Sequence, residues 1–209
     1  MSALRRWWEA TVVPRIVERA CSADDISGAR RRTTAGLHGD VVEIGFGTGL
    51  NLPHLPEAVT TLHAVEPQDA GQRIGAARIA ESAVPVQFVG LDAQTIPLAD
   101  ASMDSALCTF TLCTIPDAEV ALSELIRVLK PGGTLNFLEH GLSPDAGVAA
   151  WQRRLSPFQR RLCGGCTFDR PVADLVTGAG LELVELDNWY RPGPKTPSYI
   201  YRGVARKSA

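Results

Sequence analysis

The sequence predicts an α/β domain with a mainly parallel sheet and helices on both of its faces. From residue 40 onward, apolar strand-like segments alternate with helix-like segments, and glycines and prolines separate them. Such alternation at short spacing is typical of parallel strands joined by helical crossovers. No internal repeat or low-complexity tract interrupts the pattern, and 209 residues suffice for one hydrophobic core.

Residues 1–37 precede the first predicted strand and are expected to be helical. Apolar side chains recur on one face at helical spacing: Leu4, Trp7, Trp8 and Val12. Pro14 fits the first turn of a second helix, and Ser22 or Asp24 can cap the next one. The basic run at 30–32 is interpreted as a solvated helix face.

Buried strands are expected next along the chain. Apolar runs bounded by turn residues place them at 40–45, 60–66, 86–89, 103–110 and 134–140. The Ala- and Arg-rich stretch 68–82 suits a helix between the second and third of them. A glycine-rich turn and a short helix are expected after the first strand, so strands and helices continue to alternate as in an α/β domain.

The next helix begins after Asp117, a residue type that caps helix N-termini. Its apolar stripe comprises Ala118, Ala121, Leu122, Leu125 and Leu129. The segment 130–133 should end this helix, because Lys130 suits the last turn and the glycines allow a left-handed exit. Two more helices and two more strands are expected at 146–162, 169–178, 182–186 and 198–205.

Composition and charge limit the classes of function. The chain has 21 Lys and Arg against 23 Asp and Glu, which argues against a nucleic-acid binder or a polybasic membrane protein. Hydrophobic residues are 45% and charged residues 21%, as in an ordinary globular domain. No apolar run approaches the roughly 18 residues that cross a bilayer, and the first residues do not resemble a secretory signal. We therefore expect a cytoplasmic protein with no stable membrane insertion; the oligomeric state is not predicted.

The cysteines do not predict a disulfide framework. They are odd in number and scattered: Cys21, Cys108, Cys113, Cys163 and Cys166. Cys163 and Cys166 have the CxxC spacing, but no second such pair or histidine pair accompanies them. No metal site is expected, and most of these cysteines are interpreted as small buried hydrophobic residues.

The glycine-rich turn after the first strand is the main candidate for ligand binding. In parallel sheets, ligands bind beyond the carboxyl ends of the strands. Gly45, Gly47 and Gly49 allow a sharp turn that brings backbone N–H groups against a ligand. A dinucleotide fingerprint would need its third glycine at position 50, which is Leu50. Glu43 would repel a pyrophosphate but attract a cationic ligand.

This motif, an acid followed by GxGxG, resembles the first motif of the class I S-adenosylmethionine-dependent methyltransferases. The resemblance implies a Rossmann-like seven-stranded sheet, with 1–37 as an N-terminal helical lid and 38–209 as the methyltransferase domain. It also implies that Glu66 holds the ribose hydroxyls and Asp92 the adenine amino group. The full set of cofactor-binding residues implied by the resemblance is Glu43, Gly45, Phe46, Gly47, Gly49, Asn51, Glu66, Pro67, Asp92, Ala93, Thr109 and Phe110.

A closer resemblance extends over about residues 38–205. The segment 96–104 is similar to a run in the ubiquinone and menaquinone biosynthesis methyltransferases. Further segments look most like the alkyl thiol S-methyltransferases: 112–117, 127–133, 138–140, 151–152 and 165–166. The chain departs from the pattern of this family at two places. Gln94 stands where a Glu is common in the family, and only the Trp7-Trp8 segment stands where the microsomal members carry a hydrophobic anchor.

The resemblance implies methyl transfer from S-adenosyl-L-methionine to a small, largely apolar acceptor, with thiol sulfur favoured and S-adenosyl-L-homocysteine as product. O-, N- or C-methylation of a phenol, quinol or heterocycle is the alternative, and a non-enzymatic binder of S-adenosylmethionine is a distant third. The charge balance disfavours a protein or nucleic-acid methyltransferase. The absence of glycine at position 50 disfavours a nicotinamide oxidoreductase.

Methyl transfer mainly requires that a nucleophile be held about 3 to 3.5 Å from the methyl group. If a base takes part, His140 is the candidate, because it follows a strand at the ligand-binding edge. A structural hydrogen bond at the strand end is the alternative for His140. The candidate acceptor-binding residues are Trp7, Trp8, Cys113, Trp151 and Cys166, each of which core packing would also explain.

Overall fold

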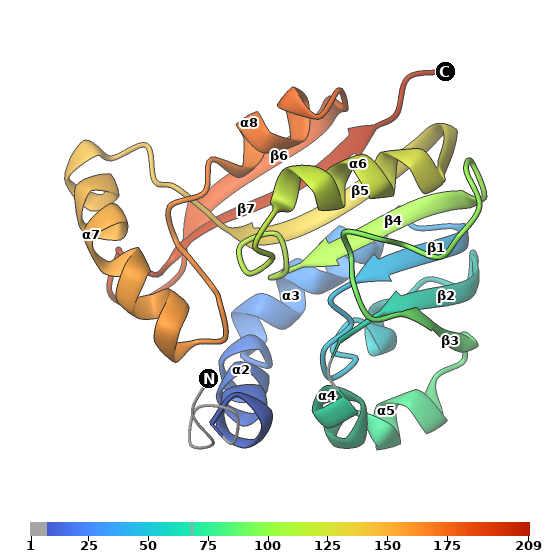
Figure 1. Ribbon diagram of the computed structural model, residues 1–209, viewed down its shortest axis with the longest axis horizontal. Helices are drawn as coiled ribbons and strands as arrows, with labels where there is room; N and C mark the ends of the chain where they lie inside the picture. The colour runs from blue at the N-terminus through green and yellow to red at the C-terminus, as the bar shows by residue number, and fades with distance from the viewer. Residues whose placement is uncertain (1–7, 68) are drawn as a thin grey trace.

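The computed structural model describes residues 8–67 and 69–209, and its centre is one seven-stranded sheet (Figure 1). The strand order is β3-β2-β1-β4-β5-β7-β6. The strands from β3 to β5 are parallel, whereas β7 is antiparallel to both β5 and β6. The α/β class and the mostly parallel seven-stranded sheet predicted from sequence are therefore confirmed.

The strands follow the predicted apolar runs closely. Their bounds are β1 Gly39–Ile44, β2 Val59–Val65, β3 Val86–Gly90, β4 Met103–Thr109, β5 Leu129–His140, β6 Glu182–Tyr190 and β7 Tyr199–Arg206. Two strands are longer than predicted, because β5 begins at Leu129 and β6 continues to Tyr190. The strand order reverses between β1 and β4, so their carboxyl ends flank the point at which such sheets bind ligands.

The helical elements are η1 Trp8–Val12, α2 Val13–Cys21, α3 Asp24–Thr34, η2 Leu52–His54, α4 Asp69–Ile74, α5 Ala76–Glu81, α6 Ala118–Val128, α7 Ala146–Leu162 and α8 Val172–Gly178. Helices cover both faces of the sheet. Alternate residues of a strand point to opposite faces, and β5 shows this: Phe137 packs on the side of α6 and α8, whereas Leu138 packs against Ile26 of α3.

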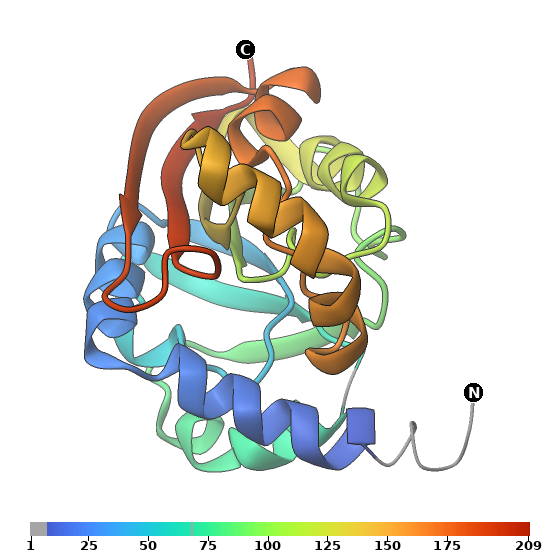
Figure 2. The same cartoon turned by 90° about the vertical axis from the view of Figure 1, so that its left-hand side faces the viewer.

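The N-terminal helices lie next to the elements that follow β1 and β2. Figures 1 and 2 show α2 beside α4 and α5. An ion pair joins them, because Glu18 of α2 lies 2.5 Å from the Arg78 guanidinium of α5. Glu18 also accepts a hydrogen bond from the Thr48 hydroxyl in the glycine-rich turn. The segment 8–37 is thus attached at the carboxyl edge of the sheet.

The predicted helix at 68–82 is two short helices, α4 and α5, with Gly75 between them. Gly71 and Gly75 face the backbone of the glycine-rich turn. A Cβ atom at Gly71 would lie 2.8 Å from the Gly47 carbonyl carbon, and one at Gly75 would lie 2.8 Å from the Thr48 carbonyl carbon. Glycine at both positions therefore allows these helices to pack directly on the turn.

Three predictions about helix ends have different outcomes. Asp117 does cap α6, because its carboxylate accepts a hydrogen bond of 3.1 Å from Val120 N–H. The cap of α3 is Ala23 and neither Ser22 nor Asp24, since Ala23 is the residue with extended backbone before the helix. Lys130 is not in the last turn of α6, because that helix ends at Val128 and the following residues already extend along β4.

Among the described residues, no helix combines the length and the apolar character needed to span a bilayer.

Candidate functional site

The glycine-rich turn after β1 is built from residues in the left-handed region of backbone space. Gly45, Gly47 and Gly49 have φ values of 72°, 56° and 72°. A side chain at Gly45 would also collide with the side chain of Thr111, which follows β4. Larger residues are therefore excluded from Gly45 both by strain and by space. The turn lies at the carboxyl edge of the sheet, but the N–H groups of its glycines are bonded within the protein and do not face a ligand as expected: Gly45 donates to the Val65 carbonyl oxygen, Gly47 to the Glu66 carboxylate and Gly49 to the Phe46 carbonyl oxygen.

Glu66, directly after β2, is held against this turn. Its side chain is 6% exposed, and its carboxylate accepts a hydrogen bond of 2.7 Å from Gly47 N–H. Pro67 follows it and is exposed. The sequence predicted that the acid after the second strand serves the same site as the glycines, and the structure brings the two together.

Asp92 and Ala93 follow β3 at the same edge. The Asp92 carboxylate accepts a hydrogen bond of 2.9 Å from Gln94 N–H, which fixes its orientation in the turn. Asp92 is exposed, so its carboxylate is available to a ligand, and Ala93 packs against the core. Gln94 therefore supports Asp92 through its backbone, and its amide side chain lies 3.4 Å from the same oxygen.

Polar side chains form a buried network beneath the glycine-rich turn. Asn51 donates to Glu43 at 2.6 Å and to the Thr109 hydroxyl at 2.9 Å. A guanidinium nitrogen of Arg30 donates to Asn51 at 2.8 Å and to Thr109 at 2.9 Å. These side chains come from α3, β1, β4 and the segment after the turn, so the network joins elements that are distant in sequence.

Two polar atoms of this network have no hydrogen-bond partner among the described residues: Glu43 Oε2 and Arg30 Nε. Both residues are almost fully buried, at 1% and 5% exposed, and the Cys21 thiol of α2 lies near the guanidinium. Buried polar groups normally satisfy their hydrogen-bonding capacity. A carboxyl oxygen and a guanidinium N–H that are both unpaired within one network are groups of the kind that bind the ammonium and the carboxylate of a ligand.

Arg30 is the functional candidate that the sequence did not identify, and the interpretation of 30–32 as a solvated face was wrong for this residue. Arg31 and Arg32 are exposed, but Arg30 is buried. The signal lies in the helical phase of α3. Its buried residues, Ile26, Ala29, Arg30, Thr33 and Thr34, recur at the three- and four-residue spacing of one helix face.

Burial raises the pKa of Glu43 to about 8, although Asn51 and Arg30 partly oppose this shift. A carboxyl whose pKa rises on folding stabilises the protein below its unfolded pKa, and this stabilisation is lost as the pH approaches 8. We therefore expect Glu43→Gln to reduce the loss of stability between about pH 5 and 8 by at least about 1 kcal/mol. Denaturant unfolding of both proteins across this range checks it, and parallel curves would contradict it.

The segment after β4 links this network to a second group of side chains. Phe110 has a φ of 54°, an uncommon conformation for a residue with a side chain. Its ring lies 5.5 Å from the Arg30 guanidinium and 4.9 Å from the ring of His140, which ends β5. Phe110 therefore lies between the buried network and the edge of the sheet at β5.

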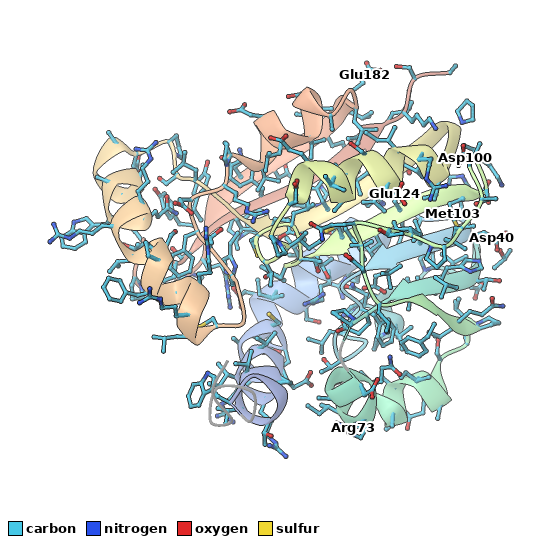
Figure 3. All side chains as sticks on the ribbon, in the orientation of Figure 1. Asp40, Arg73, Asp100, Met103, Glu124 and Glu182 are labelled. Carbon is cyan, nitrogen blue, oxygen red and sulfur yellow. The ribbon has the colours of Figure 1, made fainter. Side chains whose placement is uncertain are left out.

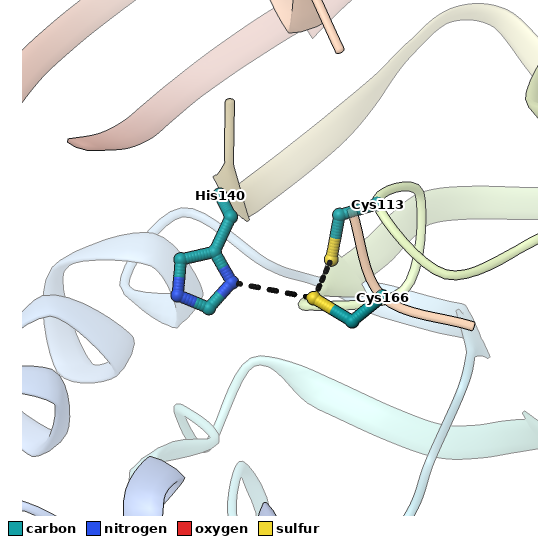
Figure 4. Close-up of side chains that lie close together, drawn as sticks. All are labelled: Cys113, His140 and Cys166. Atoms are coloured by element: carbon teal, nitrogen blue, oxygen red, sulfur yellow. Dashed lines mark hydrogen bonds between the residues drawn. The ribbon is translucent and has the colours of Figure 1, made fainter. Parts of the chain in front are cut away.

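Cys113, His140 and Cys166 meet at this edge (Figure 4). The two sulfur atoms are 3.7 Å apart, and Cys166 Sγ lies 3.8 Å from His140 Nδ1. The hydrogen bond from Cys113 and, secondarily, the nearby His140 ring lower the pKa of Cys166 to about 5, against the opposing effect of burial. The Cys166 hydrogen bond and burial together raise the pKa of Cys113 well above its ordinary value.

The tryptophans predicted as acceptor-binding residues are not gathered here. Trp8 donates its indole N–H to the Leu162 carbonyl oxygen at 3.2 Å. Trp151 is 55% exposed and stacks with Arg154 on α7. Trp7 lies outside the described residues. The structure thus brings together Cys113, Cys166 and His140 from the predicted acceptor and catalytic set.

The opposite edge of the sheet has a different character. Figure 3 labels Asp40, Asp100 and Met103 at the amino ends of β1 and β4. Asp100 and Glu124 both bind the Arg127 guanidinium there, at 2.6 and 2.8 Å. Because these charges pair with each other, they are less available to a ligand than the side chains at the carboxyl ends of the strands.

Comparison with known proteins identifies relatives of the chain. A family model described as a methyltransferase domain matches residues 42–137. The chain is 31% identical to the thiol S-methyltransferase TMT1B of Rattus norvegicus, over 80% of this chain and 67% of that protein. It is 29% identical to a phosphatidylethanolamine N-methyltransferase of Cereibacter sphaeroides, over 75% of this chain and 78% of that protein. It spans 64 to 67% of the length of the first three thiol S-methyltransferases matched.

The fold also matches solved structures. A putative methyltransferase from Bacillus halodurans C-125 superposes with a TM-score of 0.70, over 88% of this chain and 100% of that chain. The two sequences are 17% identical, so this likeness concerns the fold.

Proposed function

Since the chain belongs to the class I S-adenosylmethionine-dependent methyltransferases, we propose that it methylates the sulfur of a small, largely apolar thiol. The observation that carries this proposal is the meeting of two features at one sheet edge. The glycine-rich turn and its buried polar network suit the cofactor, and the cysteine–histidine group suits a sulfur acceptor. The similarity to thiol S-methyltransferases supports the choice of sulfur.

The described residues fit S-adenosylmethionine by their chemistry. We assign the Arg30 guanidinium to its carboxylate and Glu43 to its ammonium group, because both side chains retain an unpaired buried atom. Glu66 suits the two ribose hydroxyls, since a carboxylate offers several acceptor sites. Asp92 suits the adenine amino group from its place after β3. Bound here, the cofactor supplies a methyl group already activated by a positive sulfur.

Residues 8–37 are assigned the role of covering the cofactor. The ion pair between Glu18 and Arg78 and the hydrogen bond from Thr48 fasten α2 beside the glycine-rich turn. Arg30 itself comes from this segment and enters the buried network. The N-terminal helices therefore both shield the site from water and provide one of its binding groups.

On the acceptor side, the protein has to orient the sulfur and help it to lose its proton. We assign the latter role to His140, with Cys113 and Cys166 beside it. Phe110 and Phe168, whose rings lie 4.9 and 6.1 Å from the His140 ring, provide apolar surroundings that suit an alkyl chain. In the transfer, the acceptor sulfur gains a bond to the methyl carbon as the carbon–sulfonium bond breaks.

Release of S-adenosylhomocysteine by the purified protein tests the acceptor class. We expect turnover with small alkyl thiols that exceeds turnover with phenols, quinols, amines and phosphatidylethanolamine vesicles by at least about tenfold. His140→Ala should lower thiol turnover by about 100-fold, the range in which positioned proton-transfer groups contribute. Trp151→Ala, at an exposed position of α7, is the control that should keep full activity. Rapid turnover of a phenol or amine without any thiol turnover would refute the sulfur assignment.

A further inference from the structure

The group formed by Cys113, His140 and Cys166 has the composition of a metal site. Its three donor atoms all lie within 4.8 Å of one another. They come from the segment after β4, the end of β5 and the loop after α7. Figure 4 shows the Cys166 sulfur between the Cys113 sulfur and the His140 ring. Among the residues that the structure describes, no fourth His, Cys, Asp or Glu joins this group.

Contacts that do not involve sulfur hold the two cysteines together. Thr167, next to Cys166, donates its backbone N–H to the Cys113 carbonyl oxygen at 2.9 Å and its hydroxyl at 3.2 Å. Gly165 has a φ of 101° and faces the Thr114 carbonyl oxygen, where a Cβ atom would lie at 3.0 Å. The close approach of the sulfurs is therefore imposed by the backbone of both loops.

A buried carboxylate orders the loop that carries Cys113. Glu139 is fully buried and accepts hydrogen bonds from the backbone N–H groups of Leu112 at 3.0 Å and Cys113 at 3.1 Å. The Arg170 guanidinium donates to the Leu112 carbonyl oxygen at 2.6 Å from the other side. Such surrounding hydrogen bonds are what keep the ligands of metal sites in position.

Two of the three donor spacings match tetrahedral zinc, and the third lies within 4.8 Å. Two Zn–S bonds of about 2.3 Å place their sulfur atoms about 3.8 Å apart, and one Zn–S and one Zn–N bond place S and N about 3.6 Å apart. The corresponding distances in the protein are 3.7 and 3.8 Å. Two cysteines and one histidine with a fourth position open is also a ligand set of catalytic zinc sites.

We propose that Cys113, Cys166 and Nδ1 of His140 bind one zinc ion, whose fourth position takes the acceptor sulfur as a thiolate. The thiols of Cys113 and Cys166 release their protons to solvent as they bind the metal, and the acceptor's S–H bond breaks in the same way, with its proton leaving to solvent, when its sulfur takes the fourth position. His140 then promotes this proton loss as a metal ligand. The role of the fourth position rests on the proposed function, whereas zinc binding itself does not.

This proposal departs from the expectation of no metal site. The CxxC spacing paired Cys166 with Cys163, but the structure pairs it with Cys113, 53 residues away. Cys163 is outside the group of donor atoms, although it lies in the same loop as Cys166. It therefore provides a matched control for the ligand assignment.

Cobalt(II) titration of the purified full chain tests the site, because cobalt reports thiolate ligation and tetrahedral geometry by its absorption. We expect one cobalt per chain, displaced by zinc. Cys113→Ser, Cys166→Ser and His140→Ala should each weaken cobalt binding by at least about 100-fold, more than is typical of losing a supporting hydrogen bond. Cys163→Ser should bind as the wild type does. Binding of S-adenosylhomocysteine by each variant, measured by calorimetry, shows that it is folded.

The outcomes separate the two proposals. Absence of stoichiometric cobalt binding, or equal weakening by Cys163→Ser and Cys166→Ser, overturns the metal site even if thiols are methylated. A site that binds cobalt, with an absorption spectrum changed by small alkyl thiols and unchanged by phenols, supports it. A cobalt site whose spectrum does not respond to thiols overturns the role of the fourth position. Failure to methylate any thiol overturns the proposed function and leaves the ligand assignment intact.

Discussion

Arg30→Ala is expected to weaken the binding of S-adenosylmethionine by about 100-fold. In the structure, Arg30 is 5% exposed, and its Nε has no hydrogen-bond partner among the described residues. Truncating one partner of a buried charge pair typically costs 2 to 5 kcal/mol, and about 2.8 kcal/mol corresponds to 100-fold. Isothermal calorimetry with S-adenosylhomocysteine, which carries the same carboxylate, measures the effect.

Two further variants and one ligand analogue are the controls for this measurement. Arg31→Ala removes an exposed arginine from the next position of α3 and should leave the affinity unchanged. Arg30→Lys keeps the charge but lacks the planar fork, so it should bind with intermediate affinity. Decarboxylated S-adenosylhomocysteine should bind to wild type and Arg30→Ala alike. Equal affinities of Arg30→Ala and wild type for the full ligand would show that the guanidinium does not bind the carboxylate.

Glu66→Gln is expected to lower the affinity for the same ligand by about 30-fold. The carboxylate already accepts a hydrogen bond of 2.7 Å from Gly47 N–H, which fixes it against the glycine-rich turn. A glutamine has one acceptor oxygen and an amino group, so it can satisfy Gly47 but not two ribose hydroxyls as well. Loss of hydrogen bonds to a charged group costs about 1.5 to 3 kcal/mol.

A ligand without one ribose hydroxyl isolates this contact. The 2′-deoxy form of S-adenosylhomocysteine should bind to the wild type more weakly than the parent, whereas Glu66→Gln should discriminate little between them. Glu57→Gln, at an exposed position before β2, is the control. If Glu66→Gln loses affinity but still binds the 2′-deoxy form more weakly than the parent, by the same factor as the wild type, then Glu66 has a purely structural role in the turn.

The fold and the grouping of side chains around the glycine-rich turn were largely predictable from sequence, because both depend on local patterns. Apolar runs mark strands, and the residues directly after parallel strands gather at one edge. Glu66 and the glycines could therefore be assigned to one site, and Gly47 N–H does bind the Glu66 carboxylate. The helix broken at Gly75 escaped prediction because the break depends on contact with the backbone of Thr48.

The remaining site residues depend on tertiary contacts that spacing along the chain does not report. Three successive arginines look alike in sequence. Which of them is buried depends on the face that α3 turns toward the sheet, and in the structure this face includes Arg30 but neither Arg31 nor Arg32. Cys113 and Cys166 are far apart in sequence and meet because Thr167 binds the Cys113 carbonyl oxygen. Trp151 is the opposite case. Its segment resembles the thiol methyltransferases in sequence, but the structure places the tryptophan at an exposed position of α7.

The crystal structure of the complex with S-adenosylhomocysteine tests whether Arg30 and Glu66 bind the cofactor and direct its sulfur toward the cysteine–histidine group. We expect a ligand along the carboxyl ends of the strands from β3 to β4, with its carboxylate on Arg30 and its ribose on Glu66. Its sulfur should then point toward His140 and Cys166. A ligand bound elsewhere would contradict the assignment of the cofactor site, and one whose sulfur points away from the cysteine–histidine group would contradict the role of that group in methyl transfer.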